Sequence, residues 1–263
     1  MMLAWLVISF FFPTRWVAFS GIVACGAPMV LFKHSVRGVT FGARDCNTAK
    51  YKISEYALFF AFCICGAALV SAITYLTTVA FGTDVPQSGG RTDFFYLLVF
   101  SCFIPAFFEE WFMRGGVLGT LAKHRGAGVL ICAVLFALMH MSIAKIPYAF
   151  FSGLFITALV YLTECVYLGM LLHFLNNLTS LVLSYLPSGV GEYIMLGVIA
   201  VAFLVSAAFF KKTSLCRDTV SLFSSVKKEE IKELCTPCFW VFAASVAVIV
   251  LCASVFTLLL PAQ

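Results

Sequence analysis

Residues 94–119 read FFYLLVFSCFIPAFFEEWFMRGGVLG, and this stretch decides the class of fold. A helix needs about 20 mainly apolar residues to cross a hydrocarbon core of roughly 30 Å, so the stretch predicts a membrane span. It nevertheless contains Glu109, Glu110 and Arg114. Because a charge at the bilayer centre costs about 2.5 to 3.5 kcal/mol on insertion scales, these three side chains are candidates for a functional site.

The rest of the chain is equally apolar. Of 263 residues, 62% are hydrophobic and 11% are charged, a composition that excludes a soluble globular domain. Seven further runs are apolar and long enough to span: residues 16–32, 55–81, 127–144, 146–163, 166–186, 191–210 and 238–260. We therefore predict a single all-α integral membrane domain over residues 1–263, a polytopic bundle of about eight helical spans.

Basic residues indicate how the bundle is oriented. Two polar segments, Lys33–Lys52 and Lys211–Glu233, interrupt the spans, and a third short loop contains Lys123. If all three face the cytoplasm, 13 of the 17 Lys and Arg residues lie inside, as the positive-inside rule expects. Both termini then lie outside. The net charge of +5 reflects this topology, so we expect contact with lipid and no binding of nucleic acid.

The eleven cysteines are scattered along the chain, and most fall in apolar runs, where cysteine behaves as a small hydrophobe. We therefore expect no disulfide framework. Cys235 and Cys238 have CxxC spacing but no second pair, and we interpret them as part of an interfacial turn before the last span.

Few polar groups lie deep in the predicted spans, and their spacing is informative. Glu110 and Arg114 stand four apart, so on a helix they can pair on one face, whereas Glu109 points about 100° away from them. Pro105, four residues before Glu109, removes a backbone hydrogen bond and is expected to bend the helix near the carboxylates.

Two further spans carry histidine. His173 and Asn177 are four apart and share a helix face, and Phe136 stands four before His140, which would place its ring beneath the imidazole. Counted from the cytoplasmic turns, Glu109 and His140 both lie roughly 20 Å deep, so we expect them to meet. His173 lies roughly 12 Å deep and Asn177 roughly 18 Å, a looser match that needs helix tilt.

The residues Glu109-Glu110-x-x-x-Arg114, Phe136-x-x-x-His140 and His173-x-x-x-Asn177 follow one another on successive spans. In that order they resemble the CPBP family of CAAX proteases and bacteriocin-processing enzymes, which includes the type II CAAX prenyl endopeptidases. The resemblance covers about residues 95–185, the expected catalytic core. It implies an intramembrane endopeptidase that cleaves membrane-associated peptides or proteins.

The resemblance also implies roles for these side chains. Glu109 would be the general base that activates water, and His140 would orient that water and relay its proton. His173 and Asn177 would donate hydrogen bonds to the oxyanion of the tetrahedral intermediate. The pair formed by Glu110 and Arg114 would hold the site together, as supporting residues.

A metal-dependent reaction is the alternative at the same site. Glu109, His140 and His173 are credible ligands for zinc or another divalent ion, but the His-Glu-x-x-His signature of many zinc peptidases is absent. Without that signature we favour metal-independent hydrolysis and no cofactor.

Two other classes of function remain to be distinguished. A proton-coupled carrier would predict inverted repeats, and the chain has one acidic cluster with no counterpart in its other half. A silent scaffold or immunity protein would bind a peptide in the same site without cleaving it. The substrate of an enzyme would be a membrane peptide or protein, with a prenylated protein as an alternative. Short loops favour a multi-pass protein of a bacterial cytoplasmic membrane, the endoplasmic reticulum membrane being the eukaryotic alternative.

Overall fold

The computed structural model describes residues 46–80, 93–140, 142–185 and 190–259, and every regular element in them is helical. The predicted all-α class is therefore confirmed. The long helices are α3 (Ile53–Ala80), α7 (Arg125–Met139), α8 (Ile146–Thr163), α9 (Val166–Ser184), α10 (Val190–Phe210) and α13 (Pro237–Leu259). A composite helix runs through α4 (Phe94–Leu97), η3 (Leu98–Phe103), α5 (Ile104–Glu110), η4 (Trp111–Val117) and α6 (Leu118–Leu121).

Seven of the eight predicted spans fall in the described residues. Within the described residues, five helical stretches are long and apolar enough to cross a membrane, or six if the bent pair α12 (Lys228–Leu234) and α13 forms one span. The predicted span 16–32 lies outside the described residues. The bend of 75° between α12 and α13 falls at Cys235–Pro237, where the sequence predicted an interfacial turn.

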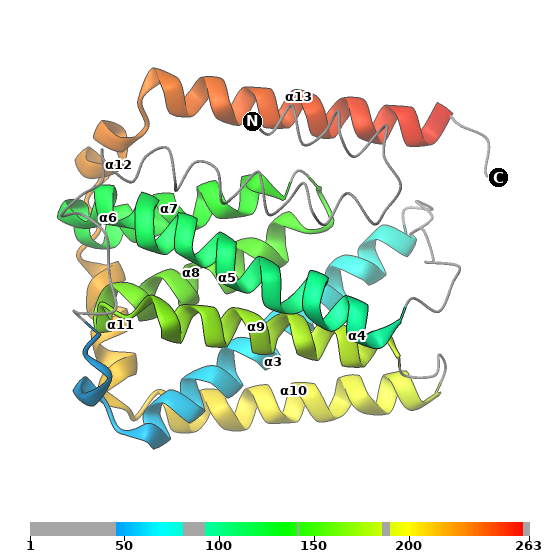
Figure 1. The fold of residues 1–263 in the computed structure, drawn as a ribbon, viewed down its shortest axis with the longest axis horizontal. Coiled ribbons are helices and arrows are strands. Elements are labelled where there is room, and N and C mark those ends of the chain that lie inside the picture. Colours follow the sequence, from blue (N-terminus) through cyan, green and yellow to red (C-terminus); the bar gives the residue numbers. More distant parts are fainter. Residues whose placement is uncertain (1–45, 81–92, 141, 186–189, 260–263) are drawn as a thin grey trace.

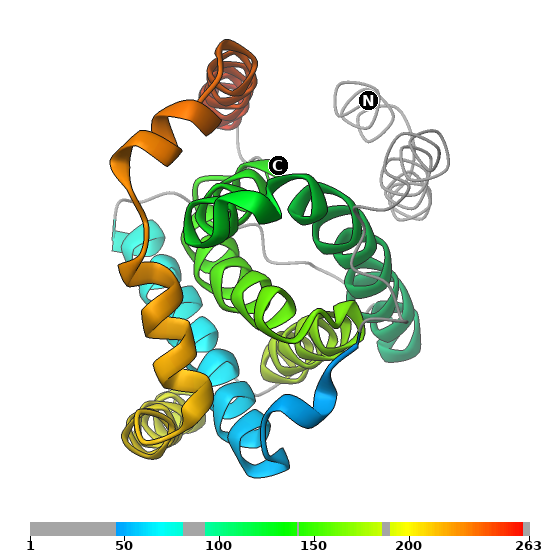
Figure 2. The same ribbon diagram turned by 90° about the vertical axis from the view of Figure 1, so that its left-hand side faces the viewer.

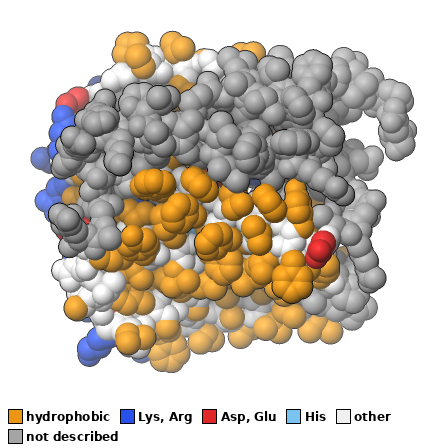
Figure 3. All heavy atoms as spheres, viewed as in Figure 1, with side chains coloured by type: hydrophobic (Ala, Val, Ile, Leu, Met, Phe, Trp, Pro, Cys, Tyr) orange, Lys and Arg blue, Asp and Glu red, His pale blue; other side chains and the backbone are white. Residues whose placement is uncertain are grey.

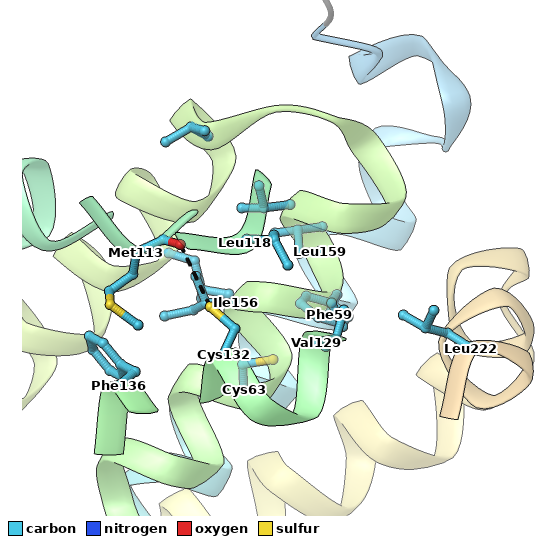
Figure 4. Packing of buried hydrophobic residues seen from close by; sticks show 14 of the residues in the cluster. Phe59, Cys63, Met113, Leu118, Val129, Cys132, Phe136, Ile156, Leu159 and Leu222 are labelled. Carbon is cyan, nitrogen blue, oxygen red and sulfur yellow. Dashed lines mark hydrogen bonds between the residues drawn. The ribbon is translucent and has the colours of Figure 1, made fainter. Parts of the chain in front are cut away.

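One of these five stretches, Phe94–Met139, reverses its direction and so contains two of the predicted spans. The reversal follows η5 (Ala122–His124), where Arg125 adopts a positive φ of 47°. Beyond it the Cys132 thiol contacts the Met113 carbonyl oxygen at 3.6 Å (Figure 4). Residues 19 apart in one straight helix would be roughly 28 Å apart, so α7 runs antiparallel beside the composite helix.

The helices that hold the core are α3, α7, α8, α9 and α10. Helix α8 packs against α3, α7 and α9, and α3 packs along α10 (Figures 1 and 2). Six phenylalanines form the contact of α3 with α8 and α10: Phe59, Phe62, Phe151, Phe155, Phe203 and Phe210. Their ring centroids are 5.0 to 6.4 Å apart, the range in which edge-to-face and offset aromatic pairs are favourable.

The polar segment 211–233 is more ordered than a loop. It contains α11 (Ser214–Ser224) and α12, which lie across one end of the bundle (Figure 2). Thr213 caps α11 by accepting from the Cys216 N–H at 3.1 Å. The Glu55 carboxylate accepts from the Ser214 N–H and hydroxyl, at 3.1 and 2.7 Å, and so satisfies further groups of the helix start.

One disulfide corrects the expectation for the cysteines. Cys46 is bonded to Cys165, across 119 residues of sequence. The neighbouring Asn47 N–H donates to the Thr163 carbonyl at 2.9 Å, so the segment before α3 is tied to the turn between α8 and α9. The other seven described cysteines are free. Spacing alone could not reveal this pair because its members meet only when three helices pack.

The surface agrees with a multi-pass membrane protein. Apolar side chains cover the described part of the lateral face, and Lys and Arg gather at one end (Figure 3). We call this the basic end; it is formed by the segment 50–52, the turn after α6, and the elements α11 and α12. The positive-inside rule predicts that this end faces the cytoplasm.

Candidate active site

The two glutamates end α5, between two wide π-helical turns, η3 and η4. Such turns inside α-helices occur frequently at functional sites. Pro105 has no N–H to give to the carbonyl four residues earlier, which belongs to Ser101. The amide nitrogen of Asn177 donates to that carbonyl at 3.3 Å. Pro105 therefore leaves the Ser101 carbonyl free to accept a hydrogen bond from Asn177 on α9.

Glu110 and Arg114 form the predicted pair. Arg114 Nη1 donates to Glu110 Oε1 at 2.7 Å, and both side chains are 0% exposed. Two more hydrogen bonds hold the guanidinium on α8: Nη2 donates to the Gly153 carbonyl at 3.1 Å and Nε to the Thr157 hydroxyl at 3.2 Å. A buried pair is stable only when such additional bonds compensate for its lost hydration, and here α8 provides them.

The Phe136 ring joins this ion pair to both histidines. The guanidinium of Arg114 lies 4.2 Å from the ring centroid, in cation–π contact. The same ring packs edge-on against His140 and His173, with centroids 5.0 and 5.8 Å apart, so the predicted stacking beneath His140 is confirmed. A Cβ at Gly153 would lie 2.7 Å from this ring, which explains why α8 has a glycine there.

His173 also binds Glu110. Its Nδ1 lies 2.8 Å from Glu110 Oε1, the oxygen that already accepts from Arg114. An ionised carboxylate only accepts, so Nδ1 carries the hydrogen and Nε2 remains available. Oε2 of Glu110 is buried and has no hydrogen-bond partner among the described residues. Glu110 thus links α5 to α9 by a hydrogen bond, rather than facing a substrate.

Glu109 and His140 are placed differently. Both are partly exposed, whereas Glu110, Arg114 and His173 are buried. His140 follows the last residue of α7, and its Nδ1 lies 3.0 Å from the Phe136 carbonyl, which requires the hydrogen on Nδ1 and leaves Nε2 as an acceptor. His140 is close enough to Glu109 and His173 to interact electrostatically with both. Direct contact between Glu109 and His140 stays a prediction.

One residue of this site was not anticipated. Tyr148, in the first turn of α8, is close enough to Glu109 and to the Ser180 side chain of α9 to interact with both. Tyrosines are common in membrane proteins, and only the folded hairpin of α7 and α8 brings this phenol to the carboxylate. The sequence contains no motif that distinguishes Tyr148 from the other tyrosines.

Glu109, His140 and His173 were also considered as ligands of a metal ion. Within the part of the chain that the structure describes, no three His, Cys, Asp or Glu side chains converge closely enough to hold one. Glu109, His140 and His173, the ligand set considered from the sequence, do not fit a metal as they are placed. We therefore derive no step through one.

A comparison with known families matches this geometry. Residues 91–179, about a third of the chain, match the family model described as type II CAAX prenyl endopeptidase Rce1-like, and the match contains all three motifs. Over these residues the chain is similar to the CAAX protease family. The match supports, in general terms, a protease of the CAAX type. No curated protein and no solved structure gives a significant match.

Proposed function

We propose that this CAAX protease relative hydrolyses a peptide bond of a membrane-associated polypeptide with Glu109 as the general base. The proposal rests on the different surroundings of the two adjacent carboxylates. Glu110 is fully buried and bound to Arg114 and His173. Glu109 is partly exposed and close enough to His140 to interact with it electrostatically. A base must reach water, and of the two only Glu109 is partly exposed.

His140 orients the attacking water. With its Nδ1 hydrogen directed to the Phe136 carbonyl, the free Nε2 can accept a proton from that water or hold it by a hydrogen bond. Glu109 takes the proton as the water attacks the scissile carbonyl, and then delivers it to the leaving amine.

His173 and Asn177 stabilise the oxyanion. Because Nδ1 of His173 is held by Glu110, Nε2 is the ring nitrogen left to donate to a substrate, which requires a hydrogen on it. Asn177 uses one amide hydrogen on Ser101 and retains the other. Each donor of this kind commonly contributes about 10² to 10³ in rate.

The test is cleavage of a membrane-presented peptide library by the purified protein in detergent. We expect Glu109→Gln to lower kcat by at least about 10² with the fold intact, as loss of general base catalysis does. Glu164→Gln, at an exposed turn between α8 and α9, is the matched control and should keep full activity. Activity that survives Glu109→Gln would exclude Glu109 as the base.

Two additional experiments distinguish a glutamate protease from a metalloprotease, and a lipid-dependent reaction from a lipid-independent one. Loss of cleavage in chelator with rescue by a divalent ion would make the enzyme a metalloprotease, and cleavage unaffected by chelator supports the glutamate mechanism. Prenylated and unprenylated copies of each cleaved peptide then show whether the lipid is required. An absence of cleavage from well-folded protein in every arm would exclude the peptidase and favour a carrier or a silent scaffold.

A further inference from the structure

One face of α9 runs along the whole candidate site. Its members stand four, three and four residues apart, so they share that face, and they are Gly169, His173, Asn176 and Ser180. A Cβ added at Gly169 would lie 3.3 Å from Glu110 Oε2, and His173 Nδ1 lies 2.8 Å from Glu110 Oε1. At the other end of the face, Ser180 is close enough to Tyr148 to interact with it. Asn176 therefore lies between the buried ion pair and Tyr148.

The packing of α9 on α8 gives the surroundings of Asn176. The two helices follow one another after a short turn and run antiparallel, side by side (Figures 1 and 2). A Cβ added at Gly169 would contact Ile156 and Val160 of α8. Asn176 stands seven residues farther along α9, so it lies at the level of segment 149–153, seven residues back along α8. The side chain is therefore packed among helices, and it is not on the lipid-facing side.

The Asn176 side chain is buried and has no partner. The residue is 4% exposed, and its amide makes no hydrogen bond with any of the residues that the structure describes. The Ser180 hydroxyl donates to the backbone carbonyl of Asn176 and leaves the side chain free. Asn177 differs, since its amide nitrogen donates to the Ser101 carbonyl. Buried amides are normally paired because an unpaired one is costly, so Asn176 requires an explanation.

Both polar atoms of this amide can be reached by a ligand. Among the described residues, the side-chain atoms that are sealed from solvent and lack a hydrogen bond are Tyr56 Oη and Glu110 Oε2. The oxygen and nitrogen of the Asn176 amide are unpaired and are not among these sealed atoms, so each keeps some accessible surface. The small exposed area of Asn176 therefore includes the two atoms that can form hydrogen bonds.

A substrate brings groups that need such a partner. A peptide bond can be attacked only when the segment around it is unwound, and its neighbouring N–H and C=O groups then lose their own helical bonds. Within a bilayer, water does not replace these bonds, so the protein must provide them. A carboxamide suits this need because its oxygen accepts a hydrogen bond and its nitrogen donates one, which matches the two groups of a peptide unit.

We propose that Asn176 binds the main chain of the substrate beside the scissile bond. Asn176 stands three residues from His173, roughly 4.5 Å along α9, and an extended chain advances about 3.3 Å per residue. With the scissile carbonyl at His173, a peptide group one or two residues away meets Asn176. The contact selects an extended polypeptide and no particular side chain, because every sequence has the peptide group. This assignment rests on the proposed peptidase function, because it specifies how the same site holds its substrate.

Asn176→Leu tests this contact, because leucine is close in size to asparagine and forms no hydrogen bond. The variant should lower kcat/KM for a cleaved library peptide at least about tenfold, mainly through a higher KM, since the contact already exists in the bound substrate. Its unfolding temperature in detergent should be unchanged or higher, because an unpaired amide leaves the interior. Asn176→Ala serves the same comparison if leucine cannot be accommodated.

Thr179→Val is the matched control. Thr179 lies on the same helix, and its hydroxyl donates to the Leu175 carbonyl within α9. This variant should keep both the activity and the unfolding temperature of the unsubstituted chain. If Asn176→Leu and Asn176→Ala lower the unfolding temperature together with the activity, Asn176 has a structural role and the proposal is overturned. Unchanged activity in both would overturn it too, and would leave the peptidase function standing.

A second experiment locates the contact on the substrate. Each peptide bond near the scissile one is replaced in turn by an ester, which lacks the N–H and has a weaker acceptor oxygen. At the position that Asn176 binds, the ester should raise KM at least about tenfold for the unsubstituted chain and have little further effect in Asn176→Leu, since both changes remove one contact. Effects that multiply at every position would overturn the proposal. If the unsubstituted chain cleaves no peptide, the peptidase function fails, and this proposal with it.

Discussion

At the scale of single residues, the site combines a rigid support with an accessible carboxylate. Arg114 donates three hydrogen bonds, to Glu110, Gly153 and Thr157, and its guanidinium also packs on Phe136. A charge so enclosed cannot lose its partner without a large cost, because water cannot replace the partner. The same pair is expected to contribute to stability and only indirectly to catalysis.

Substitution of Arg114 by methionine tests this support. Arg114→Met leaves the Glu110 carboxylate buried without its cation, so the free energy of unfolding should fall by about 3 to 5 kcal/mol. The double variant Glu110→Gln/Arg114→Met removes both charges. Its loss of free energy of unfolding should be smaller than the sum of the losses of the two single variants. Unfolding in detergent measures both, with exposed Arg217→Met as the control. Strict additivity would show that the two charges are not coupled.

Tyr148 gives a second prediction at this scale. Its phenol neighbours Glu109 and the Ser180 side chain, where it can position the carboxylate or donate to charge that develops on the substrate. Tyr148→Phe should lower kcat/KM by about 10 to 100-fold without changing unfolding in detergent, since a single donor is lost. Tyr161→Phe, on the same helix but 13 residues toward the basic end, should keep full activity. Equal activity of both variants would exclude a role for the Tyr148 hydroxyl.

At the scale of the elements, the sequence predicted helices better than it predicted their junctions. Apolar length placed α8 at its observed bounds and placed α10 within a residue, because a span must be continuous and apolar. The turns η3 and η4 were not anticipated, because a π-turn depends on contacts from α8 and α9 to the backbone and side chains. Helix α11 lies in a segment that the sequence identified only as polar, since its apolar residues pack only on the finished bundle.

The attachment of α11 gives a prediction for alkaline pH. The Tyr51 hydroxyl, just before α3, donates to Asp218 of α11 at 2.6 Å. Burial, and then this bond to Asp218, raise the pKa of Tyr51 well above its ordinary value. In the unfolded chain the Tyr51 phenol ionises at about pH 10. Above that pH the folded state keeps the phenol proton that the unfolded state has lost.

Stability contributed by Tyr51 is therefore fully present below about pH 10 and is lost as the pH rises toward the folded-state pKa. The free energy of unfolding should fall more steeply above about pH 10 in the unsubstituted chain than in Tyr51→Phe. At neutral pH the variant should be less stable by about 1 to 3 kcal/mol, the value of a hydrogen bond to a charged group. Parallel curves in detergent unfolding from pH 8 to 11 would contradict the assignment.

At the scale of the whole molecule, the site depends on contacts between distant segments. The motifs predicted which residues belong together because each lies on one helix face, and Glu110 and Arg114 are paired as expected. They could not predict that His173 binds Glu110, or that Cys46 binds Cys165, since both bonds depend on how helices dock. The disulfide holds the start of α9, the helix that carries His173 and Asn177, against the segment before α3.

The disulfide therefore should stabilise the bundle as a unit. It closes a loop across 119 residues, for which the chain-entropy model gives about 4 to 5 kcal/mol. Cys165→Ser should lower the free energy of unfolding in detergent toward that extent, and a membrane-permeant reductant should lower it similarly in the unsubstituted chain but not in the variant. Cys238→Ser, at an exposed free cysteine, is the control and should behave as the unsubstituted chain does. If reductant leaves the unfolding of the unsubstituted chain unchanged, the two segments are held by packing and by the Asn47–Thr163 hydrogen bond alone.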